Sequence, residues 1–261
     1  MAACAYLGAW LFGSYPPERT VTAYPGSLRE TAALEGIAIR SEALFPANHS
    51  ISVADGARIP AGTRLSQEGA QAVFAPGSAL CFAGGDGYES LSPAALRPFS
   101  LERLQELMDC TPEKADRNAL RLVYDFCWYY AATTPEPCPI EEGTWTQVLF
   151  SGMEGPVSAR VCAVDKSGGS TALLLRIGAM SPEYLCIRKC SAELIIAEHS
   201  GLAIPASAVR SDSGGAEFVY ILSAGKRERR EVEIIYTQGE TSIVSLGSGA
   251  DALREGDAVY G

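Results

Sequence analysis

The chain has 261 residues, with 31 acidic and 21 basic side chains and a net charge of −10 when histidine is neutral. Binding to nucleic-acid phosphates needs clustered cations, so this acidic balance argues against a nucleic-acid partner. Hydrophobic residues make up 47% of the chain, enough for a core, and 26 glycines with 15 prolines favour short strands joined by turns. The length fits one large domain or two to three small β modules.

The chain begins with a short apolar and aromatic stretch, residues 4–13, which a proline pair ends at residues 16–17. It is too short to cross a bilayer, which takes about twenty residues. No lysine or arginine precedes it, unlike a signal peptide. Two interpretations are open: the outer end of a membrane anchor that begins upstream, or a short docking helix. The aromatic residues Tyr6, Trp10 and Phe12 are typical of a membrane interface.

Two strands are predicted next, at residues 20–23 and 27–40, followed by short strands around tight turns in residues 43–67. This half is similar to half of a lipoyl-like barrel-sandwich. A lipoyl or biotinyl carrier would need a lysine at its hairpin tip. No lysine lies in this half, because the four lysines of the chain are Lys114, Lys166, Lys189 and Lys226. The module is therefore predicted to be a structural scaffold.

Residues 66–74 leave room for only about one turn of helix before the chain continues. Residues 91–107 are predicted to be helical, with Ser100 capping an apolar stripe that includes Leu104 and Leu107. Residues 119–134 have helical spacing, but their aromatic and β-branched content favours two strands, at 120–124 and 128–133. Four further strands at 145–150, 157–165, 171–177 and 184–196 are typical of a small β-barrel.

The last sixty residues contain two alternating apolar runs, at 217–222 and 231–236, on either side of a charged stretch at 225–230. This pattern predicts a hairpin. The densest basic patch of the chain, residues 226–230, would then lie at the hairpin tip as a solvated turn. Pro205 is predicted to open a strand, and Gly256-Asp257 to form a turn before a last short strand.

The chain has few residues suited to catalysis. Its only histidines are His49 and His199, and it contains no nucleophile elbow, metalloprotease motif or phosphate loop. Asp86 and Glu89 could serve as acid and base, but carboxylates in a turn are more often solvated. We assign no catalytic, cofactor-binding or metal-binding residue.

Eight cysteines show no C-x-x-C pair, and the sequence does not fix any pairing among them. Cys186 and Cys190 lie four residues apart near His199, which would give half a metal site if the segment were helical. In a strand they would act as small apolar residues. A cysteine nucleophile would require one of them to reach His199 with a lowered thiol pKa.

Two short stretches occur in a fixed order near the end of the chain: Gly201-Leu202-Ala203-Ile204-Pro205-Ala206-Ser207-Ala208-Val209, and then Leu253-Arg254-Glu255-Gly256-Asp257-Ala258-Val259. Both resemble the C-terminal, membrane-proximal module of the HlyD-type periplasmic adaptors, also called membrane fusion proteins. Each stretch alone consists of residues that are common in β-rich domains. The two are specific for the family only as an ordered set.

Other stretches resemble a branch of the family found in Gram-positive anaerobes. Thr20-Val21-Thr22-Ala23 is followed by Gly36-Ile37-Ala38-Ile39-Arg40-Ser41-Glu42, and later by Asp86-Gly87-Tyr88-Glu89. Arg188 with Ala192-Glu193-Leu194-Ile195-Ile196 resembles a further family strand. The long helical hairpin that most members insert within the sandwich has no counterpart here, which puts docking onto an outer-membrane tunnel in doubt.

The resemblance covers residues 18–261 and implies an all-β fold with a short helical segment. It implies an anchor end at 1–17, a membrane-proximal module of 18–42 plus 201–261, and a barrel-sandwich at 43–134 with a helical segment at 91–117. A β-barrel would occupy 135–200. The first and last strands would pair.

By this resemblance the protein is a non-catalytic adaptor subunit of an efflux or transport system, held in the cell membrane by one N-terminal anchor with its body extracytoplasmic. It would assemble with an inner-membrane transporter and could form homo-oligomers. The alternative is an extracytoplasmic module that binds a ligand or envelope polymer. A pocket lined by Trp128, Tyr129, Tyr130 and Trp145 would favour that alternative.

Overall fold

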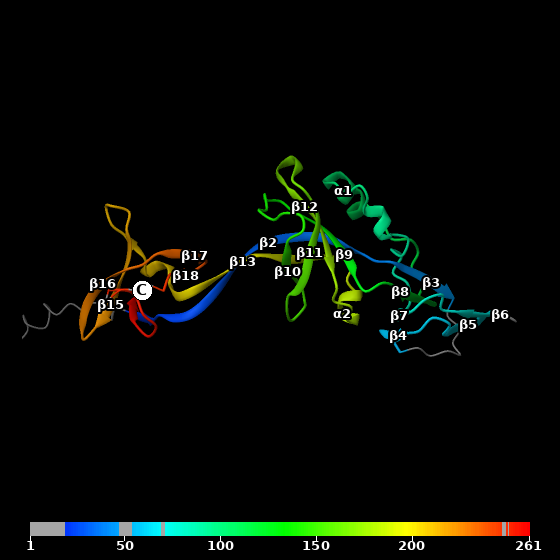
Figure 1. The fold of residues 1–261 in the computed structure, drawn as a ribbon, viewed down its shortest axis with the longest axis horizontal. Helices are drawn as coiled ribbons and strands as arrows, with labels where there is room; N and C mark the ends of the chain where they lie inside the picture. Colours follow the sequence, from blue (N-terminus) through cyan, green and yellow to red (C-terminus); the bar gives the residue numbers. More distant parts are fainter. Residues whose placement is uncertain (1–18, 47–53, 69–70, 247–248, 250) are drawn as a thin grey trace, which may run out of the picture. The chain divides into compact units, whose positions relative to one another are not determined.

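The computed structural model describes residues 19–46, 54–68, 71–246, 249 and 251–261 (Figure 1). They fold as two compact units. We call Thr31–Ile196 the barrel unit, and the segments up to Glu30 and from Ala197 onward the C-terminal module. Strands dominate both units, so the predicted all-β class is confirmed. The N-terminal stretch at 1–17 and His49 lie outside the described residues.

Six strands of the barrel unit form a closed β-barrel: the four that were predicted to form a small barrel, joined by β2 and β9. Their order is β10-β11-β12-β9-β2-β13, and the pairing of β10 with β13 closes the barrel. The strands are β2 (Tyr24–Ile39), β9 (Trp128–Thr134), β10 (Trp145–Phe150), β11 (Val157–Asp165), β12 (Thr171–Ile177) and β13 (Lys189–Pro205). β2 and β13 are long strands that continue into the C-terminal module.

The barrel is filled by side chains from all six strands, because every second residue along each strand points inward. On β9, Trp128 and Tyr130 point inward and are fully buried, together with Phe150 of β10. The indole nitrogen of Trp128 donates to the carbonyl of Ala179 at 2.7 Å, and the hydroxyl of Tyr130 donates to the carbonyl of Cys190 at 2.6 Å. The polar tips of both rings therefore have partners inside the core.

A short helical segment covers part of the outer barrel face. It consists of η1 (Pro93–Leu96) and α1 (Leu101–Asp109), whose Leu104 and Leu107 pack on outward side chains of β2, β9 and β12. The outward residues Ala172 and Leu174 of β12 are therefore buried, like its inward residues, whereas Arg176 near the end of the strand is exposed. Ser100 caps α1 as predicted, its hydroxyl accepting the amide of Arg103 at 3.1 Å. The helix is shorter than the predicted 91–107, because extended residues, including Arg97 and Ser100, separate η1 from α1.

Asp165, at the end of β11, adds a second cap to α1 from outside the helix. Its carboxylate accepts the amide of Leu101 at 2.8 Å, and this bond lowers the pKa of Asp165. We expect Asp165→Asn to make the first turn of α1 exchange its amide hydrogens several-fold faster. In the parent protein, protonation of Asp165 should weaken the same cap. This weakening begins as pH falls below 3.8, the ordinary pKa of aspartate, and is complete once pH has passed below the lowered pKa of Asp165 in the fold. Site-resolved hydrogen exchange measures both effects, and Asp109→Asn, at the far end of the helix, serves as control.

The rest of the barrel unit is a small sandwich. One sheet has the order β3-β8-β7-β4, and a separate ribbon pairs β5 with β6. The strands are β3 (Glu42–Pro46), β4 (Ala57–Ile59), β5 (Arg64–Glu68), β6 (Gln71–Phe74), β7 (Ala79–Ala83) and β8 (Ala119–Val123). Residues 64–68 and 71–74 thus pair as strands, in a stretch that left room for only about one turn of helix.

Three boundaries differ from those predicted. Residues 128–134, expected in the sandwich, form β9 and pair with β12 and β2 in the barrel. Residues 110–118, expected to be helical, contain no helix. Strand β13 begins at Lys189 rather than 184, because Ser181-Pro182 starts a short helix, α2 (Pro182–Leu185), which takes up the intervening residues.

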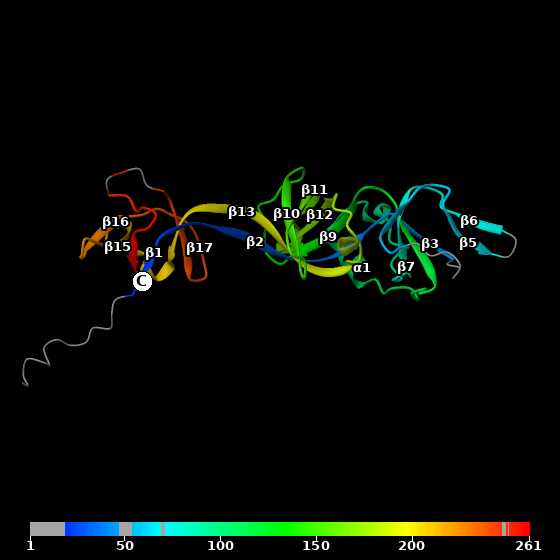
Figure 2. The same cartoon turned by 90° about the horizontal axis from the view of Figure 1, so that it is seen from below.

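The C-terminal module contains a sheet of order β1-β19-β15-β14, with β16 on the other side of β15. The end of β13 pairs with β18, and β18 pairs with β17. The strands are β1 (Thr20–Thr22), β14 (Arg210–Ser211), β15 (Glu217–Ser223), β16 (Lys226–Glu231), β17 (Ile234–Gln238), β18 (Thr241–Val244) and β19 (Ala258–Tyr260). The first and last strands pair as predicted, with Val21 opposite Val259 (Figure 2).

The prediction that residues 217–222 and 231–236 form a hairpin is wrong. β15 pairs with the charged stretch 226–231, and the turn is the pair Ala224-Gly225, both with positive φ. The basic patch is therefore a strand and not a solvated tip. Arg227 lies 4.2 Å over the ring of Tyr220, and Arg229 lies 4.2 Å over that of Phe218. The aromatic faces of β15 stabilise this charged strand.

No helix in the described part of the chain is both long and apolar enough to span a membrane.

Candidate functional site

Five charged side chains meet in the barrel unit, and we call them the charged cluster: Arg40, Glu42, Asp86, Arg121 and Arg188. Arg188 forms short ion pairs with both carboxylates, through Nη2 to Glu42 and through Nε to Asp86. Arg121 Nη1 lies 3.4 Å from Glu42 and 3.2 Å from Asp86. Each carboxylate thus lies between the same two guanidinium groups.

The cluster unites segments far apart in the sequence. Arg40 follows the last residue of β2, Glu42 opens β3 and Arg121 lies in the middle of β8. Asp86 is in the turn after β7, and Arg188 precedes β13. Residues 36–42, residues 86–89 and Arg188 lie far apart in the sequence, and the fold makes side chains from all three neighbours.

A tight turn presents Asp86 to the cluster. The Glu89 carboxylate accepts the amides of Asp86 at 2.6 Å and Gly87 at 3.0 Å, and Asp86 Oδ1 accepts the amide of Tyr88. Gly87 has a φ of 86°, and a Cβ there would lie 2.2 Å from the carbonyl oxygen of Glu113. Only glycine fits this position. Both carboxylates thus build this turn, and Asp86 also takes part in the ion pairs of the charged cluster.

Burial and mutual charge set the ionisation of the cluster. Burial and the charge of Arg188 lower the pKa of Arg40 to about 9. Burial also raises the pKa of Glu42, against the attraction of Arg188 and Arg40. Burial opposes ionisation of Asp86 as well, but the hydrogen bond and charge of Arg188 outweigh it and lower the pKa of Asp86. The side chain of Asp86 is 33% exposed, so its desolvation is smaller than that of the fully buried Glu42.

Arg40 is the arginine of the cluster that forms no ion pair with a carboxylate of the described residues. It is fully buried and lies 5.5 Å over the ring of Trp128, and its Nη2 donates to the carbonyls of Ile187 and, at 3.1 Å, Tyr184. Three arginines against two carboxylates leave one surplus positive charge in the interior. The cluster joins the sandwich to the barrel through fixed ion pairs, and this arrangement suits a structural connection.

The cysteine and histidine candidates each have their own surroundings within their units. Burial raises the pKa of the Cys190 thiol to about 11, the reverse of what a nucleophile needs. His199 stacks on Tyr236 with ring centres 4.5 Å apart and lies 3.2 Å from Glu30. Within the described residues, no group of three His, Cys, Asp or Glu side chains could hold a metal ion, and the seven described cysteines are free.

The four aromatic residues expected to line one pocket are distributed among different environments. Trp128 and Tyr130 lie inside the barrel, and Trp145 is 66% exposed. Tyr129 points to the outer face, where it lines a cavity beside η1. The alternation of side chains along β9 explains this result, since neighbouring residues of one strand face opposite sides.

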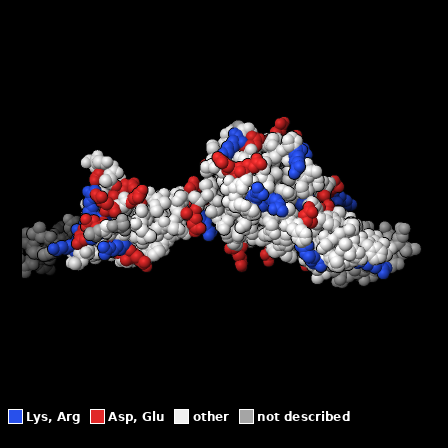
Figure 3. All heavy atoms as spheres, viewed as in Figure 1, with Lys and Arg blue, Asp and Glu red and all other residues white. Residues whose placement is uncertain are grey.

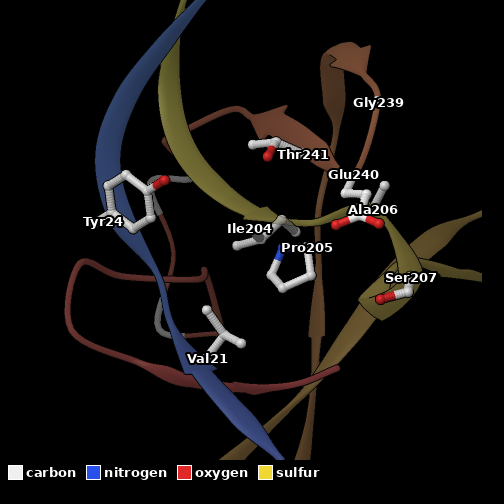
Figure 4. A pocket seen from close by; sticks show the side chains of 9 residues that line it. All are labelled: Val21, Tyr24, Ile204, Pro205, Ala206, Ser207, Gly239, Glu240 and Thr241. Atoms are coloured by element: carbon white, nitrogen blue, oxygen red, sulfur yellow. The ribbon is translucent and has the colours of Figure 1, made fainter.

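A groove of about 510 Å³ lies in the C-terminal module (Figure 4). Val21 and Tyr24 line one side, and the motif residues Ile204 and Pro205 lie across from them. Val21 is 41% exposed and Tyr24 is 54% exposed. The groove thus presents apolar side chains on a module that is otherwise rich in charged residues.

Gly201 begins the motif 201–209, and close packing of two strands explains why this position is a glycine. A Cβ at Gly201 would lie 2.3 Å from the carbonyl oxygen of Val244 on β18. A larger residue would push β18 away from β13, on which Pro205 lies opposite Thr241 at the edge of the groove. The motif therefore maintains the geometry of the groove.

No protein-family model and no curated protein matches the sequence. Several solved structures are similar to this chain, and two of them are ZneB and MacA. ZneB from Cupriavidus metallidurans is 11% identical, with a TM-score of 0.32 and coverage of 92% of this chain and 91% of that one. MacA from Actinobacillus actinomycetemcomitans is 12% identical, with a TM-score of 0.40 and coverage of 92% and 98%. Both TM-scores are below 0.5, so neither likeness bears on what this chain binds.

Proposed function

We propose that the chain is a non-catalytic adaptor subunit of an envelope transport system, acting by assembly with a membrane transporter. The pairing of β1 with β19 carries the proposal, because it ties the start and the end of the described chain into one module. The chain leaves this module through β2 and returns to it through β13. An anchor at the N-terminus would therefore hold the C-terminal module next to the membrane, as in the adaptor family that the motifs resemble.

The finer parts of the proposal follow from the same resemblance. The protein would belong to the Gram-positive-type branch, with residues 1–17 as the end of a single anchor and the body outside the cytoplasm. The β5–β6 ribbon would take the place of the long helical hairpin. Contact with partners would then depend on module surfaces instead of tunnel docking.

The groove beside Tyr24 is the surface we assign to the transporter. It lies in the module that the anchor would hold at the membrane, and it exposes two large apolar side chains. Apolar side chains grouped on a surface are typical of interaction sites. The fixed ion pairs of the charged cluster and the high thiol pKa of Cys190 fit a scaffold rather than an enzyme.

Site-specific photocrosslinking in native membranes tests this function. A benzophenone amino acid at Tyr24 of the full-length protein should crosslink to a transporter permease subunit. The same probe at Phe126, which is 73% exposed in the barrel unit, is the matched control and should give no such product. Recovery at Tyr24 of only the protein itself would contradict the proposal. Recovery of wall components would favour the alternative, an extracytoplasmic module that binds an envelope polymer.

A further inference from the structure

The outer face of the barrel holds a second cavity, of about 490 Å³, between η1 and strands β9, β11 and β12. Its lining is mostly apolar, with Leu96 and Phe99 on one side and Tyr129, Ala163 and Leu174 on the other. Its volume lies within the range of small-molecule sites, about 300–1,000 Å³. The charged cluster and the groove of the C-terminal module involve none of these residues.

Three arginines lie at or beside this cavity. Arg97 is part of its lining. Arg176 stands opposite the lining residue Tyr129 on the neighbouring strand, and Arg160 stands opposite Arg176. These three outward residues of β9, β12 and β11 form one row across the barrel. Figure 3 shows basic and acidic side chains close together over the barrel.

The arginines have no acidic partners in the described part of the chain. None of Arg97, Arg160 and Arg176 forms an ion pair there, and Arg176 instead lies in hydrogen-bonding reach of the Cys127 thiol. Arg160 and Arg176 are near enough to Cys162, another lining residue, to act on it electrostatically. The carboxylate of Glu142 acts on the same thiol with opposite sign. In a chain of net charge −10, three arginines without carboxylates beside an apolar cavity need an explanation.

We propose that this cavity binds a small amphipathic anion, with its apolar body against Leu96, Phe99 and Leu174 and its carboxylate-type head toward the arginines. Apolar burial supplies affinity, and a charge-assisted hydrogen bond to guanidinium supplies orientation. A neutral ligand would leave the arginines unused, and a cation would be repelled. This inference is independent of the adaptor function, since it concerns a different surface of the protein.

Decanoate, used below its micelle concentration, is a suitable probe. We expect it to bind the full-length protein in calorimetry and to slow the alkylation of Cys162 by iodoacetamide, followed by peptide mass spectrometry. Cys186, which is exposed, should be alkylated at an unchanged rate. Decan-1-ol has the same chain without the charge and should bind at least tenfold more weakly.

Two variants locate the site. Arg97→Gln should weaken decanoate binding at least tenfold, whereas Arg64→Gln, an exposed arginine of the sandwich, should leave it unchanged. Ala94→Trp places an indole at the cavity from an exposed position and should block both binding and protection, while thermal unfolding shows that the fold is intact. Absence of decanoate binding would overturn the inference. So would binding that leaves Cys162 unprotected, or equal affinity for decan-1-ol together with an unaffected Arg97→Gln.

Discussion

Asp86→Asn is expected to lower the free energy of unfolding by about 2–3 kcal/mol, because it breaks two ion pairs in a largely buried site. Asparagine keeps the shape of the side chain and the oxygen that accepts the amide of Tyr88, so the turn can persist. What is lost is the negative charge between Arg121 and Arg188. Three guanidinium groups would then face the single carboxylate of Glu42.

The pH dependence provides an internal check on this prediction. The folded pKa of Asp86 is lowered below its ordinary value of 3.8, so its stabilising effect is fully present above that value. It is lost as pH falls through the lowered folded pKa. The difference in stability between the parent protein and Asp86→Asn should therefore be constant from pH 5 to 8 and should shrink in stronger acid. Urea unfolding across this range measures it.

Two further variants separate the charge effect from simple damage. Arg40→Met removes the surplus cation and keeps an apolar chain beside Trp128, so combining it with Asp86→Asn should recover part of the loss. Glu106→Gln breaks the exposed Arg103–Glu106 pair and should cost less than about 1 kcal/mol. Equal costs for Asp86→Asn and Glu106→Gln would show that the cluster contributes no more than a surface pair.

The contrast between the two carboxylates of the cluster is also informative. Glu42 is more deeply buried than Asp86, yet its burial raises its pKa, which means that the ionised form is opposed in the fold. Glu42→Gln should therefore cost less than Asp86→Asn. The more deeply buried carboxylate is thus not the one that stabilises the fold more. Deeper burial strengthens its ion pairs, but it also raises the free-energy cost of desolvating its charge.

The sequence predicted the barrel well, because its strands are separated by clear turn residues. The bounds of β10, β11 and β12 agree with the predicted ranges, and the expected pairing of the first and last strands is observed. The errors occur where local chemistry overrides alternation. Ala224-Gly225 makes a two-residue turn, so the charged stretch becomes a strand supported by aromatic rings.

The charged cluster could not be predicted from any single stretch. Its members come from five segments, and their meeting depends on how the sandwich folds against the barrel strands. One signal was available in the sequence: Arg121 interrupts the otherwise apolar run Ala119–Val123. A charged residue inside a buried strand needs a partner of opposite charge. The identity of that partner required the fold.

The aromatic core of the barrel leads to the prediction with the largest effect. Phe150→Ala should lower the free energy of unfolding by about 3–5 kcal/mol, the usual range for a buried phenylalanine. Phe150 is 1% exposed, and its ring centre lies 5.4 Å from that of Trp128 and 5.0 Å from that of Tyr130. Removing it leaves a cavity against rings whose polar tips are fixed by hydrogen bonds, so the site cannot easily collapse.

Trp145→Ala is the matched control, since it truncates a larger aromatic residue on the same strand. Trp145 is 66% exposed and should change stability by no more than about 0.5 kcal/mol. Urea unfolding of both variants, monitored by circular dichroism so that the loss of a tryptophan does not alter the signal, makes the comparison. A cost for Trp145→Ala comparable to that of Phe150→Ala would contradict the inward and outward assignment of β10. It would mean that another surface covers Trp145 in solution, and the contact would then have to be sought on that outer face of the barrel.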